Sequence, residues 1–309
     1  MDFYKDQAEW RLVQPFLPEE NRLDPKNLPE EYFYSWRDCE IHIDHYQQKN
    51  PQATIVILHG VGGNGRLLSF IAAPLWRNNY EIICPDLPLY GNTKTSGTMT
   101  YDTWVACAVD MVKRWQKKNV PLFLFGLSAG GMLAYQVANE CDSIAGIMAT
   151  CLLDQRNPHV TEQTARNKYV AKAARPLMEL THNLFPSFKI PMKSIANMKE
   201  IVNNKELAQL LMQDKRASGV KVPLSFVYSM LNPHIKIEPR DFTKCPLLLV
   251  HPQNDRWTDL HLSRLFFDEL NCKKSLKILR GAGHFPIEQT GLKDLEQFCT
   301  HFIEECIKE

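Results

Sequence analysis

A serine stands between two glycines in Gly126-Leu127-Ser128-Ala129-Gly130, which matches the pattern G-x-S-x-G. An apolar run at 120–125 precedes this motif, and the helix-forming stretch 131–139 follows it. That order predicts a strand, a sharp turn and a helix, which is the setting that exposes a serine hydroxyl as a nucleophile. The glycines leave room for the strained backbone that such a turn imposes on the serine. Ser128 is therefore the candidate nucleophile.

A histidine and a carboxylate are needed to activate this serine, because its hydroxyl is too weak an acid to attack a carbonyl unaided. Asp255 follows the predicted strand 246–250, and Gly283-His284 follows the predicted strand 275–279. The carboxyl ends of parallel strands meet at one edge of a sheet, where open α/β sheets place their sites. We therefore expect His284 to act as the base and Asp255 to orient it.

Other aspartates compete for the role of the acid. Asp259 lies one helical turn beyond Asp255, and Asp154 follows the predicted strand 144–149. Asp154 is the more serious alternative, since an acid at the neighbouring strand end could still reach the imidazole. Asp86 precedes the serine in the chain, and we expect it to brace its own loop through hydrogen bonds to the backbone.

Backbone amides are the natural donors for the negative charge that develops on the attacked oxygen. Ala129 follows the nucleophile at a predicted helix N-terminus, where free N–H groups favour negative charge. Val61 belongs to the glycine-rich loop 59–65, directly after the predicted strand 53–58. We expect Val61 and Ala129 to form the oxyanion hole. Phosphate binding by this loop is disfavoured, because it lacks the G-K-[ST] ending of a P-loop and fits a dinucleotide pattern only loosely.

Short, continuously apolar runs recur along the chain with helical stretches between them, at 53–58, 81–84, 120–125, 144–149 and 246–250. Continuous hydrophobicity indicates burial on both faces, which is typical of a parallel sheet with helices on each side. Two earlier runs, 32–36 and 40–46, are also predicted strands. Apolar and polar residues alternate in the second run, which is typical of a strand in a half-exposed pair at the edge of a sheet. The predicted fold class is α/β.

The domain organisation follows from where this rhythm breaks. Residues 1–31 contain several prolines and a possible short helix at 5–16, and we interpret them as an extension wrapped on the surface. Residues 154–240, called the cap segment below, show helical patches such as 206–212 and no clear buried strand. A structureless connection of that length is implausible, so we predict a helical cap inserted after the sixth strand. The core then comprises residues 32–153 and 241–309.

Large, adaptable apolar residues are frequent in the cap segment. They suit a channel for an acyl chain, although any cap would use the same residue types to pack itself. The set comprises Leu177, Met178, Leu180, Leu184, Phe185, Phe188, Ile190, Met192, Met198, Phe226, Tyr228, Met230 and Leu231. The candidate substrate-binding residues are Leu184, Phe188, Met192 and Tyr228 from this set, together with Trp257 of the core.

Composition excludes several other classes of protein. The 309 residues are 44% hydrophobic and 23% charged, which favours a packed core over disorder. A net charge of +1 gives no general attraction to nucleic acids or anionic membranes. The nine cysteines form no C-x-x-C pair, so neither a zinc ribbon nor a disulfide framework is indicated. Because no signal-like or membrane-spanning stretch is visible, we expect a soluble, cytoplasmic protein without stable membrane insertion.

These motifs together resemble the α/β-hydrolase superfamily, from Tyr32 onward except for the cap. The resemblance rests on His59-Gly60, Asp86-Leu87-Pro88-Leu89-Tyr90-Gly91 as a D-x-P-x-x-G loop, the motif around Ser128, Asp255 and Gly283-His284. It implies a mostly parallel twisted sheet with helices on both faces, an acyl-serine intermediate, no cofactor or metal, and a cap over the pocket. The chain is most similar to members of the monoacylglycerol-lipase and lysophospholipase type, and it also resembles N-acyl-homoserine lactone hydrolases. Tyr90 departs from the family pattern, which often has a histidine there.

The sequence thus predicts a serine hydrolase that cleaves a carboxylic ester or lactone carrying a medium or long acyl chain. The alternatives are a quorum-quenching N-acyl-homoserine lactone hydrolase, a thioesterase, or a cofactor-free haloperoxidase. A non-catalytic receptor for an acyl ligand on the same fold is a further alternative. The expected partner is a small lipophilic ester or lactone and no nucleic acid, and the sequence leaves the oligomeric state open.

Overall fold

The computed structural model describes residues 2–26, 28–167, 169, 172 and 178–308. Its main sheet has nine strands, ordered β1-β2-β4-β3-β6-β7-β10-β11 with β5 paired to β2. Strand β2 pairs in antiparallel fashion with β1, β4 and β5. All pairs from β4 through β11 along this path are parallel. The strands are β1 Glu30–Trp36, β2 Cys39–Tyr46, β3 Ala53–Leu58, β4 Tyr80–Pro85, β5 Lys94–Thr95, β6 Leu122–Gly126, β7 Ile144–Ala149, β10 Leu247–Pro252 and β11 Lys274–Leu279.

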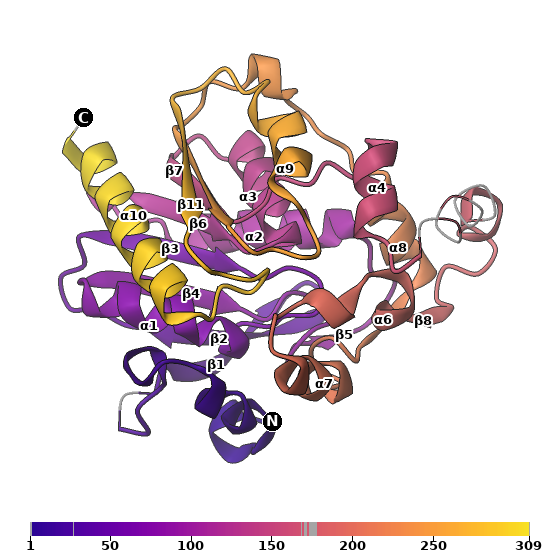
Figure 1. The fold of residues 1–309 in the computed structure, drawn as a ribbon, viewed down its shortest axis with the longest axis horizontal. Helices are drawn as coiled ribbons and strands as arrows, with labels where there is room; N and C mark the ends of the chain where they lie inside the picture. Colours follow the sequence, from indigo (N-terminus) through magenta and orange to yellow (C-terminus); the bar gives the residue numbers. More distant parts are fainter. Residues whose placement is uncertain (1, 27, 168, 170–171, 173–177, 309) are drawn as a thin grey trace.

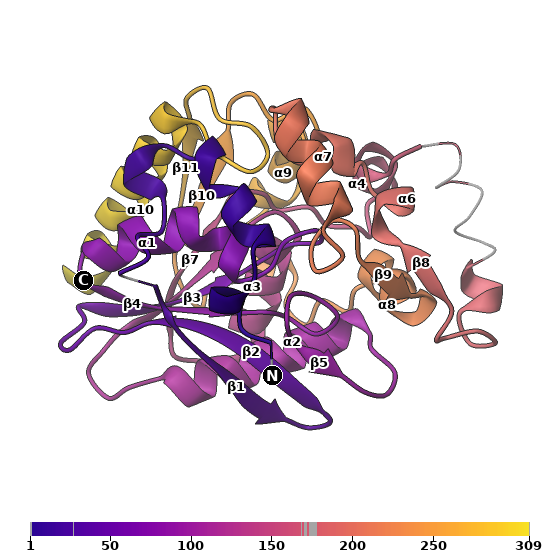
Figure 2. The same ribbon diagram turned by 90° about the horizontal axis from the view of Figure 1, so that it is seen from below.

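Helices cover both faces of this sheet, as the apolar runs predict. Every residue of β3, β4, β6 and β10 is buried, which is possible only between two helical layers. Helix α1 packs against α10, and α2 packs against α3 on the opposite face (Figure 2). The helices of the core are α1 Ser69–Arg77, α2 Tyr101–Trp115, α3 Ala129–Glu140, α9 Leu260–Phe267 and α10 Gln289–Lys308. The predicted α/β class is confirmed.

Strand β2 differs from the half-exposed strand that its alternating sequence predicts. The polar side chains of His42 and Asp44 are fully buried. The reason is that β2 lies between β1 and β4, and its polar side chains contact Glu31 of β1 and Arg66. Alternation therefore marks two buried faces here, one apolar and one ionic.

The N-terminal extension is more deeply packed than a surface wrapping. Tyr4, Trp10 and Leu17 are buried in the hydrophobic core. The single helix predicted over 5–16 is wrong: the segment forms short 3-10 turns, at Tyr4–Asp6, Glu9–Leu12, Gln14–Phe16 and Glu19–Asn21. Pro15 and Pro18 lack backbone N–H donors, so they cannot continue a longer ladder of helical hydrogen bonds.

The cap segment lies at one end of the molecule, opposite the end that carries α10, in both ribbon views (Figures 1 and 2). Helix α7 coincides with the predicted helical patch at 206–212. The segment also contains a two-stranded antiparallel sheet that its sequence did not reveal, because each strand has only three residues. Its described elements are α4 Pro158–Thr164, β8 Lys189–Pro191, α6 Met192–Ile195, the 3-10 turn Met198–Glu200, α7 Lys205–Gln213, β9 Lys221–Pro223 and α8 Leu224–Leu231.

Among the residues that the structure describes, no helix combines the length and the apolar character needed to cross a membrane.

Candidate active site

Ser128 lies at the tight turn between β6 and α3. Its backbone has φ 55° and ψ −124°, a conformation that a non-glycine residue adopts only when its surroundings enforce it. The flanking glycines allow this turn: a Cβ on Gly126 would lie 2.1 Å from the carbonyl oxygen of Gly130, and one on Gly130 would lie 2.2 Å from that of Leu58. The amide of Ser128 donates a hydrogen bond to Thr150 Oγ1 at 2.9 Å. The predicted strand–turn–helix is therefore present.

The two predicted partners of Ser128 converge on it from the loops after β11 and β10. His284 Nε2 lies 2.8 Å from Ser128 Oγ. On the other side of the ring, His284 Nδ1 lies 2.8 Å from Asp255 Oδ2. The imidazole is fully buried and Ser128 is 4% exposed, so bulk water does not compete for these contacts. Hydroxyl, imidazole and carboxylate form one continuous chain of hydrogen bonds.

Asp255 is held in its ionised form by its neighbours. Its Oδ1 accepts hydrogen bonds from the amides of Trp257 and Thr258, both at 2.8 Å, and its Oδ2 accepts one from the Thr258 hydroxyl at 2.8 Å. Burial alone would raise the pKa of Asp255, but the charge of His284 and these hydrogen bonds lower it to about 2. A carboxylate so fixed can hold His284 in one tautomer and orientation.

The rival aspartates have other partners. Asp154 forms an ion pair with Arg156 at 2.8 Å. Asp259 caps α9 by accepting a hydrogen bond from the amide of His261 at 2.9 Å. Of these aspartates and Asp255, it is Asp255 whose carboxylate faces the imidazole of His284.

Val61 and Ala129 both line the cavity at Ser128, and their amides have no protein acceptor within the described part of the chain. The loop that carries Val61 is pressed against the turn at Ser128. A Cβ on Gly60 would lie 2.7 Å from the carbonyl oxygen of Leu127 and 3.0 Å from the amide nitrogen of Ala129. The loop is also tied down by His59, which contacts the carbonyl oxygen of Gly60 at 2.8 Å through Nδ1 and accepts a hydrogen bond from the amide of Leu87. Burial lowers the pKa of His59 to about 4, so its ring stays neutral and can hold both contacts.

A largely apolar cavity of about 870 Å³ extends from Ser128 under the cap segment. Its volume lies within the range of about 300–1,000 Å³ that is typical of small-molecule sites. Met132 from α3, Trp257 from the core and Val227 from α8 contribute to its walls. Predicted cap residues that line it are Met178, Phe185, Phe188, Ile190, Met230 and Leu231.

Residues 49–289 match the model of a hydrolase family described as serine aminopeptidase, S33. The chain belongs to this family. A sequence search among curated proteins finds no match.

Solved structures confirm the predicted α/β-hydrolase fold. The chain is similar to a soluble variant of monoglyceride lipase from Saccharomyces cerevisiae in complex with a substrate analogue, with 17% identity, a TM-score of 0.76, and 94% of this chain and 98% of that chain covered. It is similar to the monoacylglycerol lipase of Paleococcus ferrophilus, with 18% identity, a TM-score of 0.66, and coverage of 87% and 99%. A thermostable carboxyl esterase from Bacillus coagulans gives 12% identity, a TM-score of 0.69, and coverage of 90% and 98%.

The candidate substrate-binding residues of this S33 family member divide into two groups. Phe188 and Trp257 line the cavity. Leu184, Met192 and Tyr228 do not. Leu184 is 71% exposed, Met192 is fully buried in the core, and Tyr228 stacks on His182 with ring centroids 3.6 Å apart. Leu177 lies outside the described residues.

Two threonines support the site without having been predicted from the sequence. Thr258 Oγ1 donates to Asp255 and also lies 3.2 Å from His284 Nδ1. Thr150 Oγ1 accepts the amide hydrogen of Ser128. An aspartate side chain commonly accepts a hydrogen bond from the backbone two residues ahead, as Asp255 does from Trp257, so its contacts with this turn could have been anticipated. Thr150 offered no comparable signal.

Proposed function

We propose that this S33 family member is a serine hydrolase that cleaves carboxylic esters carrying a medium or long acyl chain. The observation that supports it best is the hydrogen-bonded chain from Ser128 through His284 to Asp255 in the wall of a large apolar cavity. The assigned roles are nucleophile, base and orienting acid, respectively.

The proposed reaction begins when Ser128 Oγ attacks the ester carbonyl while His284 Nε2 takes the hydroxyl proton. The imidazolium is stabilised by Asp255, and the carbonyl oxygen becomes an oxyanion that the amides of Val61 and Ala129 bind. Collapse of this intermediate expels the alcohol, to which His284 returns the proton, and leaves an acyl-Ser128 ester. Water, deprotonated by His284, then releases the carboxylic acid and restores Ser128.

The cavity favours an ester with an apolar acyl group over a peptide. A peptidase that removes N-terminal residues must bind a free ammonium group, for which a carboxylate is the natural partner. Among the described residues that line the cavity, none is acidic, and Arg166 is a cation. Apolar side chains such as Met178, Phe185 and Met230 instead suit a flexible hydrocarbon chain.

Replacement of the nucleophile is the decisive experiment. Ser128→Ala is expected to lower kcat by at least about 10⁴-fold while the free energy of unfolding stays near that of the wild type. A fluorophosphonate probe is expected to label the wild type covalently and to leave Ser128→Ala unlabelled. An active, well-folded Ser128→Ala variant would refute the proposal.

The substrate class is tested with a panel of p-nitrophenyl esters, monoacylglycerols, acyl thioesters and N-acyl-homoserine lactones of increasing acyl length. The highest kcat/KM is expected for oxygen esters with medium or long chains. A higher kcat/KM for lactones or thioesters of the same acyl length would replace the proposed substrate class. Binding of acyl ligands without turnover and without probe labelling would identify a receptor.

A further inference from the structure

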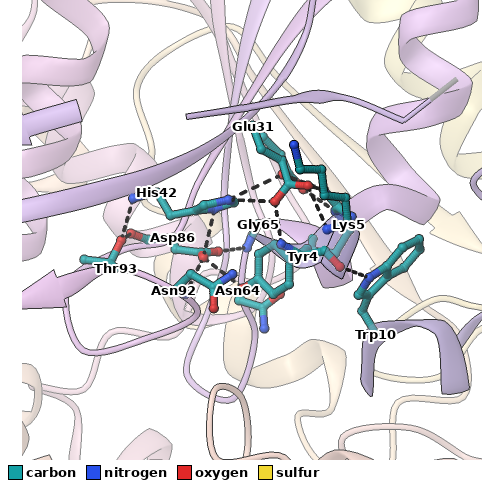
Figure 3. Close-up of polar contacts among 12 residues, drawn as sticks. Tyr4, Lys5, Trp10, Glu31, His42, Asn64, Gly65, Asp86, Asn92 and Thr93 are labelled. Atoms are coloured by element: carbon teal, nitrogen blue, oxygen red, sulfur yellow. Dashed lines mark hydrogen bonds and ion pairs between the residues drawn. The ribbon is translucent and has the colours of Figure 1, made fainter. Parts of the chain in front are cut away.

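A second cluster of buried titratable side chains lies away from the cavity, centred on Asp86 in the loop after β4 (Figure 3). Its side chains take no part in the proposed proton transfers. The cluster joins the N-terminal extension, β1, β2 and the glycine-rich loop that carries Val61. The cluster therefore ties the N-terminal part of the chain to the two loops that follow β3 and β4.

The carboxylate of Asp86 is the centre of the cluster. Its Oδ1 accepts a hydrogen bond from the amide of Gly65 at 2.7 Å. Its Oδ2 accepts hydrogen bonds from the amide of Asn92 at 2.7 Å and from the hydroxyl of Tyr4 at 2.8 Å, and lies 3.1 Å from His42 Nδ1. The expected bracing of its own loop is thus present through Asn92, but the other contacts reach outside that loop.

Glu31 closes the cluster on the side of the extension. Its carboxylate accepts hydrogen bonds from the amides of Tyr4 at 2.6 Å and Lys5 at 2.9 Å. It also contacts His42 Nε2 and the guanidinium of Arg66, each at 3.1 Å. The first turn of the extension is therefore bound through both its backbone and the Tyr4 side chain (Figure 3).

The cluster places charges of both signs side by side in the interior. Burial alone would lower the pKa of His42, but Asp86, Glu31 and Asp44 raise it to about 10, so the ring is an imidazolium at neutral pH. Burial would likewise raise the pKa of Glu31, yet hydrogen bonding with His42 and the charge of Arg66 lower it to about 2. Two cations, His42 and Arg66, thus face the three carboxylates of Glu31, Asp44 and Asp86, so loss of either cation leaves buried carboxylates without a partner.

The link to the proposed oxyanion hole runs through Gly65. This residue ends the loop 59–65, and a Cβ on it would lie 2.5 Å from the carbonyl oxygen of Cys84, so the loop is seated directly on the end of β4. Asp86 binds the amide at this end of the loop, while Leu87 donates to His59 at its beginning. Val61 lies between these two fixed points.

We infer that the N-terminal extension is a positioning element for catalysis: Tyr4 and Glu31, acting with His42, hold Asp86 so that the loop 59–65 aims the Val61 amide at the reacting oxygen. None of these side chains touches the substrate cavity. The inference rests on the proposed function, since it assigns a purpose to the same oxyanion hole.

Tyr4→Phe tests the inference, because it removes the hydroxyl bonded to Asp86 and keeps the aromatic ring that packs against Arg66 and His42. A displaced amide donor stabilises the transition state less well but changes the binding of the substrate little. We therefore expect kcat to fall about tenfold with KM nearly unchanged. A trifluoromethyl ketone, which forms a tetrahedral adduct with the serine, is expected to lose affinity by a similar factor. Binding of a fatty acid is expected to stay unchanged.

Tyr32→Phe is the matched control. It also removes one tyrosine hydroxyl from the N-terminal part of the chain. The hydroxyl of Tyr32 lies 3.2 Å from His45 Nδ1 and does not contact Asp86. Its kcat and ketone affinity are expected to match those of the wild type. Kinetics are measured well below the unfolding temperature of each variant, so that a difference in stability does not enter kcat.

Amide hydrogen exchange provides a readout that needs no substrate. Tyr4→Phe is expected to speed exchange within the loop 59–65, whereas Tyr32→Phe is not. Because this result does not depend on turnover, it remains interpretable even if Ser128→Ala retains activity and the proposed function fails. A folded Tyr4→Phe variant with the kcat, ketone affinity and loop exchange of Tyr32→Phe would overturn the inference, as would a change confined to KM.

Discussion

Two buried histidines in this molecule each lie beside a carboxylate, yet their surroundings suit them to opposite tasks. His284 has Asp255 at Nδ1 and the Ser128 hydroxyl at Nε2, each at 2.8 Å. His42 has Asp86 at Nδ1 and Glu31 at Nε2, each at 3.1 Å. One ring therefore faces a carboxylate and a proton donor, and the other faces two carboxylates.

The difference shows that burial and a carboxylate partner do not by themselves make a histidine a base. With Asp86 and Glu31 at its two nitrogens and Asp44 nearby, His42 keeps its proton and serves as a fixed cation in the interior. With a hydroxyl on its second nitrogen, His284 can receive a proton and pass it on. The group at the second ring nitrogen therefore distinguishes the structural pair His42–Asp86 from the proposed catalytic pair His284–Asp255.

The largest expected effect comes from removing the charge of each carboxylate in turn. Asp255→Asn is expected to lower kcat by about 10⁴-fold, because an amide no longer holds His284 in the tautomer that accepts a proton. Asp86→Asn leaves the buried cation of His42 with one anion fewer and is expected to lower the free energy of unfolding by about 3–5 kcal/mol. Steady-state kinetics and denaturant unfolding of both variants measure the two effects. A smaller loss of kcat in Asp255→Asn than in Asp86→Asn would contradict the comparison.

The pH dependence of stability tests the charge of His42. The pKa of His42 is raised from about 6.5 in an unfolded chain to about 10 in the fold. Its contribution to the free energy of unfolding is therefore complete below pH 6.5 and is lost as the pH rises through 10. Unfolding free energy is therefore expected to decline between pH 7 and pH 10. The decline is expected to be shallower in His42→Gln, which carries no proton to lose. Equal slopes for the two proteins in urea titrations across this range would count against the imidazolium.

The smallest expected effect concerns the hydroxyl that supports Asp255. Thr258→Val removes one hydrogen bond to an ionised carboxylate, which is worth about 1.5–3 kcal/mol, and preserves the shape of the side chain. The pKa of Asp255 is expected to rise from about 2. We expect kcat to fall about tenfold or less, with KM unchanged, because the two backbone amides still hold the carboxylate. A loss as large as that of Asp255→Asn would mean that Thr258 itself enters the proton transfer.

The parts of the molecule that could be predicted from the sequence are those whose local pattern has one physical explanation. Continuous apolar runs occur in strands covered on both faces, and loops after such strands bring Asp255 and His284 to the edge where Ser128 lies. Both the α/β fold and the convergence of these three residues could therefore be anticipated.

The remaining parts escaped prediction because their patterns have two explanations. Alternation in β2 predicted exposed polar residues, whereas His42 is buried because charges from distant segments surround it. The proline-rich extension was predicted to lie on the surface, because nothing in its sequence shows that Tyr4 bonds to Asp86. Large apolar residues of the cap can either pack in the core, as Met192 does, or line the cavity, as Phe188 does. Because both roles use the same residue types, the sequence could not distinguish them.

The hydrogen bond between Tyr4 and Asp86 spans 82 residues, and this distance along the chain bears on the order of assembly. A contact between remote segments forms only after the intervening loop has closed, which slows it relative to local structure. During synthesis, Tyr4 leaves the ribosome long before its partner exists. The contact between the extension and Asp86 therefore forms only after β4 has been made, and refolding experiments that follow burial of Trp10 would report a late step.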